Sequence, residues 1–147
     1  MQDDLQDIPV LLLSAARALV DGIDGRVRAA GFDDIRPAHG FAFARVSGAG
    51  ATVTELAEHL EITKQAASQM AEELIRKGYL QRSPHPTDAR ARLLTLTEKG
   101  HACTRAADAA AVATLEPLGR ALTGSQKQAL RTALRQLATP GRIRPTW

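Results

Sequence analysis

The sequence predicts a mostly α-helical protein that carries one small β-hairpin. Between Thr52 and Gly100 the residue pattern indicates a helix, a short turn, a second helix, a strand, a loop, a second strand and the start of another helix. Aromatic residues make up only 3% of the 147 residues, so Leu, Ala, Val and Ile must build the core. Ala-rich segments favour helices. Two tightly linked helices followed by a hairpin with a charged tip are typical of a winged helix-turn-helix lobe.

An amphipathic helix is expected near the N-terminus. Asp7 can cap it, and Pro9 is tolerated in its first turn. A second helix is predicted to begin at Pro37 and to run through Val46. The Gly- and Ala-rich segment 47–51 is expected to be a flexible connector. The first helix has an apolar stripe of about five turns, formed by Ile8, Leu12, Ala15, Leu19, Ile23 and Val27.

The next two helices form the predicted helix-turn-helix. Thr52 and Glu55 have the spacing of a capping box, in which each side chain accepts a hydrogen bond from the other residue's backbone amide. A short connector at 61–62 leads to a second helix, which Thr63 caps and Gly78 ends. One face of this helix is apolar and is expected to pack on the preceding helix; it consists of Ala67, Met70, Ala71 and Leu74.

The opposite face of this helix carries side chains suited to contact with a nucleic acid. Gln65 and Gln69, with Ser68 at the edge, are uncharged hydrogen-bonding groups. Gln can bond an adenine edge through two hydrogen bonds, and Ser can bond either base type. Lys64 and the Thr63 hydroxyl lie at the helix N-terminus, a position that favours phosphate. The alternative is a solvated polar helix face.

The predicted hairpin places a charged tip beside that helix. Tyr79–Arg82 and Arg92–Leu96 are the expected strands, and the segment 83–88 contains two prolines that stiffen the turn. Asp88 lies two residues before Arg90, so its carboxylate can brace the guanidinium in an extended position. Such an Arg suits a narrow minor groove. The alternative is an exposed ion pair, which contributes little stability.

Positive charge is concentrated around these elements. The whole chain has a formal net charge of +3. Between residues 62 and 92, six Lys and Arg residues stand against three acidic residues. This excess is a mild indication of a polyanionic partner. We therefore include Arg76 and Arg92 among the residues expected to contact DNA.

Two further helices are expected after the hairpin. Thr97 caps a long one with a narrow stripe of small residues, and Thr123 starts a last one. The winged lobe is too small to cover these stripes, but two copies could bury them at about 25 cal/mol per Å². An intramolecular bundle is the alternative. We divide the chain into a helical dimerisation region, 1–46 and 97–147, and a winged helix-turn-helix lobe, 52–100.

Five short motifs in this lobe carry a resemblance to a known family: Glu55–Ala57, Thr63–Ser68, Lys77–Leu80, Asp88–Arg90 and Leu94–Gly100. In order and spacing they resemble the MarR family of bacterial transcriptional regulators. The resemblance implies a homodimer that binds a pseudo-palindromic operator, usually as a repressor released by a small ligand. It also implies that Arg90, supported by Asp88, enters the minor groove. Positions matching Gln65, Ser68 and Gln69 would enter the major groove.

The histidines and the cysteine suggest little further chemistry. The four histidines lack the spacing of a zinc site, so no metal or cofactor is expected. His39 lies near where the family's effector pocket would form and is a candidate ligand contact; a helix-surface histidine is the alternative. Cys103, the one cysteine, excludes an internal disulfide. Within an Ala-rich stripe it is expected to pack rather than to sense redox state.

The sequence therefore predicts a DNA-binding transcriptional regulator rather than an enzyme. No Gly-rich phosphate loop, nucleophile elbow or pair of catalytic carboxylates stands out. The expected partners are double-stranded DNA, a second copy of the chain and a small-molecule effector. The acidic start and the short apolar runs predict a cytoplasmic protein with no membrane contact. The alternative function is a winged helix used for dimerisation or protein docking without sequence-specific DNA binding.

Overall fold

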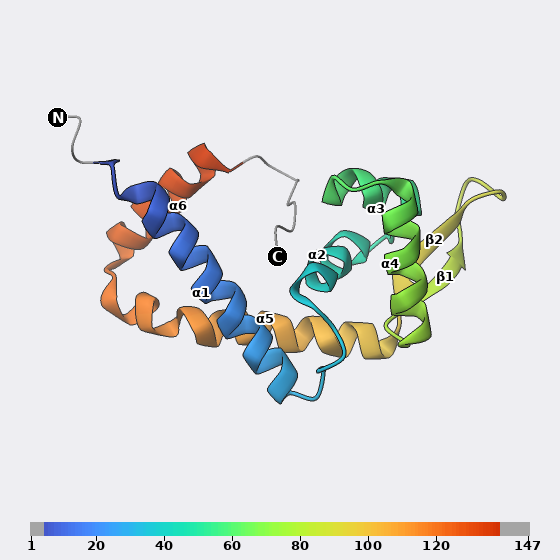
Figure 1. The fold of residues 1–147 in the computed structure, drawn as a ribbon, viewed down its shortest axis with the longest axis horizontal. Helices are drawn as coiled ribbons and strands as arrows, with labels where there is room; N and C mark the ends of the chain where they lie inside the picture. The colour runs from blue at the N-terminus through green and yellow to red at the C-terminus, as the bar shows by residue number, and fades with distance from the viewer. Residues whose placement is uncertain (1–4, 139–147) are drawn as a thin grey trace.

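The computed structural model describes residues 5–138, which form six α-helices and one two-stranded antiparallel sheet (Figure 1). This confirms the predicted fold class. The elements in chain order are α1 (Ile8–Ala29), α2 (Pro37–Val46), α3 (Val53–Leu60), α4 (Lys64–Arg76), β1 (Leu80–Pro84), β2 (Arg92–Leu96), α5 (Glu98–Ala121) and α6 (Gly124–Leu137).

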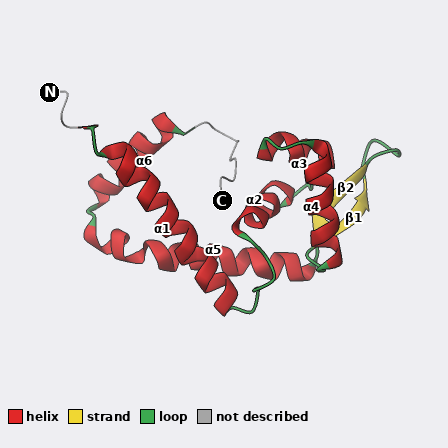
Figure 2. Ribbon diagram, in the orientation of Figure 1, coloured by secondary structure: helices red, strands yellow, loops and turns green. Residues whose placement is uncertain are grey.

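The long helix α5 joins two ends of the molecule. At one end lie α2, α3, α4 and the hairpin, and at the other end lies α6 (Figure 1). We call the first group the winged lobe; it adds α2 (Pro37–Val46) to the segment 52–100 defined from the sequence. Helix α1 crosses α5 and packs on it. Both strands belong to the winged lobe, where they form a hairpin beside α4 (Figure 2).

The core of the winged lobe is built from Leu and Ala around one aromatic cluster. Tyr79 is fully buried, and its ring lies 5.5 Å from that of Phe43 and 6.3 Å from that of Phe32 between centroids. These rings connect the end of α4 to α2 and to the loop after α1. The largest apolar side chains buried around them are Leu56, Leu60, Leu74, Leu80, Leu94 and Val46.

The helix boundaries of the lobe follow the predicted capping residues. The Glu55 amide donates to Thr52 Oγ1 at 3.2 Å, and the Thr52 amide donates to Glu55 Oε2 at 2.8 Å, which completes the capping box. Thr63 Oγ1 accepts from the Ala66 amide at 3.1 Å. Gly78, with φ +82°, turns the chain out of α4 in a conformation that side chains with a Cβ disfavour.

Three local predictions need correction. Asp7 stands before α1 but makes no side-chain cap, because its own helical backbone (φ −87°, ψ −18°) does not aim the carboxylate at the amides. The segment 47–51 is not simply a flexible connector, since Ala51 is fully buried and exchanges hydrogen bonds of 3.1 and 2.8 Å with Leu94. Strand β1 includes Ser83 and Pro84, which had been expected in the turn.

The helices outside the lobe leave much apolar surface uncovered. In the described part of α1, only Val27 is buried, and no residue of α6 is buried. Leu13 is 74% exposed and Leu137 is 70% exposed. The predicted dimerisation region, 1–46 and 97–147, extends at both ends beyond the described residues. A single copy of the chain therefore does not cover the stripes identified in the sequence.

Candidate nucleic-acid interface

Helix α4 is fixed against α3 by small and branched side chains. Ala67, Ala71 and Leu74 are completely buried, while Met70 packs at the edge of the core. Since these residues recur at three- and four-residue steps, they hold one stripe of the helix inward and turn the opposite stripe outward. Close packing through Ala keeps α4 near α3, as a helix-turn-helix requires.

The outward stripe of α4 contains the predicted base-contacting residues. Gln65 and Gln69 are exposed, and Ser68 is half-buried beside them. We call these three side chains the polar face of α4. Within residues 5–138 none of the three side chains has a hydrogen-bond partner, so their donors and acceptors remain available to another molecule.

The two ends of α4 carry the other predicted contacts of this helix. Thr63 and Lys64 are exposed at the N-terminus, where the Thr63 hydroxyl oxygen already accepts from Ala66 and keeps its own hydrogen for donation. Arg76 is exposed at the C-terminal end. The lobe thus presents a hydrogen-bonding helix face with a cation near each end.

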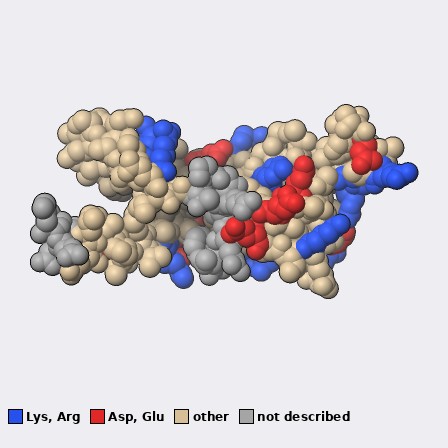
Figure 3. All heavy atoms as spheres, turned by 90° about the horizontal axis from the view of Figure 1, so that it is seen from above, with Lys and Arg blue, Asp and Glu red and all other residues tan. Residues whose placement is uncertain are grey.

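The hairpin is anchored beside α4 by an ion pair. Arg82 on β1 donates to the carboxylate of Glu72 on the exposed side of α4. The sheet register pairs Pro84 with Arg92, which leaves residues 85–91 as the tip. Arg90 and Arg92 are both exposed. Lys and Arg side chains gather at the end of the molecule that carries this wing, with acidic groups among them (Figure 3).

Asp88 supports Arg90 in a different way from the one predicted. Its Oδ1 accepts from the Arg90 backbone amide at 2.9 Å. Among the described residues, no carboxylate forms an ion pair with the Arg90 guanidinium. The carboxylate therefore shapes the turn and leaves the guanidinium unpaired, because a carboxylate two residues before an amide lies within easy reach of the backbone.

The start of α5 is hydrogen-bonded to the segment that leads into the hairpin and packs closely against it. Thr97 Oγ1 donates to the Gly78 carbonyl at 2.5 Å and accepts from the Gly100 amide at 3.1 Å. A Cβ on Gly100 would lie 2.3 Å from the Tyr79 carbonyl oxygen. Only a residue without a Cβ allows α5 to approach Tyr79, the residue before β1, this closely. This contact gives a physical reason for the Thr-x-x-Gly spacing at 97–100.

A charged cluster ties the inner side of α4 to α2. Glu73 Oε2 accepts from Arg36 at 3.2 Å, and Glu73 Oε1 accepts from Lys77 at 2.9 Å. The pKa of Glu73 is lowered, first by the Lys77 hydrogen bond, although partial burial opposes this. Arg36 and Glu73 were not among the predicted site residues. The spacing of Glu73 and Lys77 on one helix was the available signal, but the partner from α2 was not visible.

His39 belongs to this cluster and is completely buried. The alternative of a helix-surface histidine is therefore wrong. Its Nδ1 accepts from the Arg36 amide at 3.1 Å, and its Nε2 lies 3.6 Å from Glu73 Oε2. Burial, followed by the positive charge of Arg36, lowers the pKa of His39 to about 4, against the opposing effect of Glu73. The ring is therefore neutral near pH 7.

A cavity of about 240 Å³ lies between α1 and α2. His39 does not line it, but its neighbour Arg36 does. Arg36 therefore contacts both this cavity and Glu73 of α4. The complete lining consists of Arg17, Val20, Asp21, Arg36, Pro37 and Ala38.

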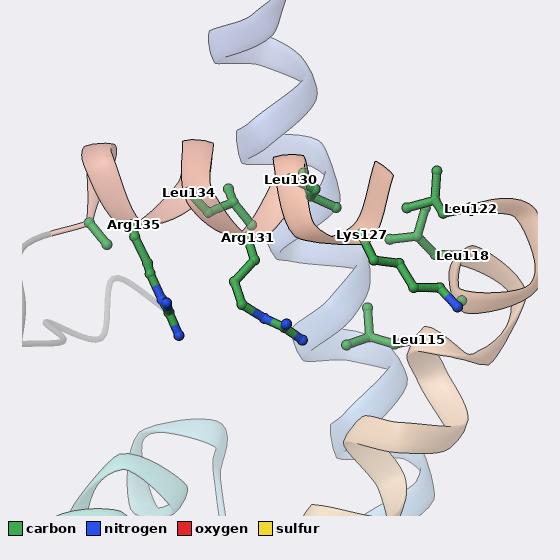
Figure 4. Close-up of a pocket in the computed structure, with 10 residues that line it drawn as sticks. Leu115, Leu118, Leu122, Lys127, Leu130, Arg131, Leu134 and Arg135 are labelled. Atoms are coloured by element: carbon green, nitrogen blue, oxygen red, sulfur yellow. The ribbon is translucent and has the colours of Figure 1, made fainter. Parts of the chain in front are cut away.

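A larger apolar groove of about 390 Å³ lies between the end of α5 and α6. Leu115, Leu118 and Leu122 come from the α5 side, and Leu130 and Leu134 come from α6 (Figure 4). Three cations, Lys127, Arg131 and Arg135, project in parallel from one side of α6 (Figure 4).

Other kinds of site receive little support. Cys103 is buried, and burial, followed by the charge of Asp34, raises its pKa to about 11, so the thiol is protonated and shielded. Across residues 5–138, no three His, Cys, Asp or Glu side chains cluster closely enough to hold a metal ion. None of the helices in that range combines the length and the apolar character needed to span a bilayer.

The winged lobe matches a known protein family. Residues 34–91 match the family model described as the MarR family. No curated protein matches the sequence. The matched segment includes α2, α3, α4 and the wing up to the residue before β2.

Solved structures share the fold over nearly the whole chain. A MarR mutant from E. coli, complexed with operator DNA, has a TM-score of 0.71 at 20% identity and covers 95% of this chain and 99% of its own. FabT from Streptococcus pneumoniae, in complex with DNA, has a TM-score of 0.79 at 22% identity, with coverages of 91% and 94%. CouR from Rhodococcus jostii RHA1, bound to p-coumaroyl-CoA, has a TM-score of 0.74 at 19% identity, with coverages of 97% and 99%.

Proposed function

Because the chain carries the winged helix-turn-helix of the MarR family, in the fold of that family's DNA-binding regulators, we propose that it is a homodimeric transcriptional regulator that binds a pseudo-palindromic operator. One observation carries the proposal: Gln65 and Gln69 on the polar face of α4 are exposed and unpaired, and the wing beside them exposes Arg90. A helix face of this kind can reach base edges, while a basic finger beside it can reach the neighbouring groove.

In the proposed complex, α4 lies in the major groove. Gln65 and Gln69 bond base edges, with a preference for adenine, and Ser68 adds a shorter contact. Thr63 and Lys64 hold phosphate at the helix N-terminus, where free amides also point. Arg76 and Arg92 contribute charge near the backbone. Such phosphate contacts set the position of the helix, whereas the polar face reads sequence.

In the same complex, Arg90 enters the minor groove. The structure supports this because the guanidinium is exposed and free of internal ion pairs within the described chain, while Asp88 fixes the backbone below it. An Arg that is already released from protein carboxylates loses no ion pair when it binds the negative potential of a narrow groove. Asp88 is therefore a positioning residue, not a direct contact.

The second copy of the chain covers the exposed stripes of α1, α5 and α6. Leu130 and Leu134, 39% and 42% exposed, line the groove in Figure 4. Their burial between two copies would be favourable by about 25 cal/mol per Å². A twofold axis would set the two α4 helices about 34–36 Å apart, one turn of DNA.

We further propose that a small carboxylate acts as the effector in the cavity between α1 and α2. Arg17 and Arg36 line that cavity together with Asp21. Because Arg17 already pairs with Asp21, Arg36 is the cation that would hold the ligand, and it also donates to Glu73 of α4. A bound carboxylate would compete with Glu73 for Arg36, and so would loosen the link between α2 and α4. His39 is buried behind Arg36, so a bound ligand would affect His39 only through Arg36. Release of DNA by such a ligand is the behaviour expected of a repressor that its effector inactivates.

Selection of duplexes from a random pool tests the main proposal. The expected product is an inverted repeat with half-sites about one turn apart. The selection is made at one fixed salt concentration, because affinity depends strongly on ionic strength. Recovery of duplexes with no shared sequence, at an affinity equal to that of competitor DNA, would favour the docking-module alternative.

A further inference from the structure

The tip of the wing is held by side chains more than by backbone pairing. Between β1 and β2, one backbone–backbone hydrogen bond of the described chain lies within the tip, from the Ala91 amide to the Asp88 carbonyl at 3.2 Å. His85 supplies the other anchor. Its Nδ1 accepts from the Thr87 amide at 3.2 Å and from the Asp88 amide at 3.1 Å. The Thr87 hydroxyl lies 3.4 Å from the same nitrogen.

The sequence around His85 prepares it for this role. Pro84 and Pro86 fix their own φ angles, and Pro86 also keeps His85 in extended backbone. From there the imidazole can fold back over the next two amides. These amides precede Arg90 by two and three residues. Asp88, whose amide His85 holds, then accepts from the Arg90 amide. His85 thus fixes the amide of Asp88, and Asp88 in turn fixes the amide of Arg90.

We propose that His85 is a positioning residue for DNA binding, and that it acts on Arg90 through Asp88. The two amides donate to Nδ1, so this nitrogen carries the lone pair and the ring proton lies on Nε2. A ring with hydrogen on both nitrogens has no acceptor for them. The wing tip therefore requires the neutral Nε2–H form of His85. This inference rests on the proposed contact between Arg90 and the minor groove.

The proposal makes the acceptor atom, not the imidazole ring, the essential feature. An Asn at this position places Oδ1 where Nδ1 stands, and Asn side chains commonly accept from amides two and three residues ahead. His85→Asn should therefore keep operator affinity close to that of the wild type. His85→Ala removes an acceptor that serves two amides and should weaken binding at least about fivefold, the factor that corresponds to the loss of one net hydrogen bond. His101→Ala, on the exposed side of α5, is the matched control and should change nothing.

A double-mutant cycle in operator affinity closes the test. If His85 acts through Arg90, the loss caused by His85→Ala should largely vanish when Arg90→Ala is already present. Equal losses in both backgrounds, or failure of His85→Asn to restore affinity, would overturn the proposal. Wild-type affinity in His85→Ala beside a weakened Arg90→Ala would also overturn it, while leaving the minor-groove contact intact. Wild-type affinity in Arg90→Ala would instead refute the minor-groove contact on which the proposal rests.

Discussion

Replacing Gly100 by Ala tests how α5 is joined to the wing. An ordinary contact for a Cβ begins near 3.4 Å, whereas a Cβ at this position would lie 2.3 Å from the Tyr79 carbonyl oxygen. The backbone would have to separate by about 1 Å, as in an overpacked core. That carbonyl accepts from the Thr97 amide at 3.0 Å, and this hydrogen bond would weaken.

The expected cost follows from three contributions. Overpacking costs about 1–3 kcal/mol, and a weakened hydrogen bond adds up to about 1 kcal/mol. The better helix propensity of Ala offsets about 1 kcal/mol. We therefore expect Gly100→Ala to lower the free energy of unfolding by about 2 kcal/mol.

Urea unfolding at one fixed protein concentration measures this change, because the stability of an associating protein depends on concentration. Gly40→Ala is the matched control. Gly40 is exposed within α2, with no atom within 4 Å of its added Cβ, so the same exchange should stabilise by about 0.5–1 kcal/mol. A Gly100→Ala variant as stable as the wild type would refute the close approach of α5 to β1.

Four further predictions concern DNA binding, assembly and pH. Arg90→Ala should weaken operator binding at least about fivefold, or 1 kcal/mol, in a gel-shift titration, with unchanged dimer mass; equal affinity would exclude wing insertion. Gln69→Ala should relax preference at one base of each half-site by about 1–3 kcal/mol, and a uniform loss across sequences would mean contact with backbone only. Leu134→Asp should shift sedimentation towards monomer; an unchanged dimer would place the interface elsewhere. His39 has a pKa of about 4 in the folded protein against 6.5 ordinarily, so the unfolded chain takes up its proton first as pH falls. Stability should be full above pH 6.5 and should decrease by about 3 kcal/mol towards pH 4, and this decrease should flatten in His39→Gln.

The sequence predicted those parts of the fold that depend on neighbouring residues. Capping at Thr52 and Thr63, the turn at Gly78 and the three-and-four spacing of Ala67 and Leu74 are local, and each is confirmed. These signals were enough to define the helices of the lobe and the exposure of the polar face of α4.

Contacts between distant residues could not be predicted in this way. Arg36 and Glu73 are 37 positions apart, and only the folded arrangement of α2 and α4 brings them together around His39. A lone histidine in an apolar segment gives no indication of that partner. The burial of Ala51 depends likewise on pairing with Leu94, which is far along the chain.

Within the site, the residue types predicted which side chains are exposed, but they did not predict which hydrogen bonds those side chains form. The sequence indicated that Asp88 supports Arg90, but the carboxylate has two competing partners, the guanidinium and the nearby backbone amide. The backbone of the tip decides between them in favour of the amide. His85 was recognised only as part of a turn, because its role depends on the direction in which the ring folds.

The dependence of affinity on half-site spacing tests the central claim most directly. In a rigid dimer the two copies of α4 face the same side of the duplex one turn, 10–10.5 base pairs, apart. Inserting five base pairs between the half-sites of a selected operator turns one of them by about half a turn, to the far side of the duplex. We expect the measured affinity to fall to that of a single half-site. Affinity unchanged by the insertion would contradict a dimer that binds both half-sites at once.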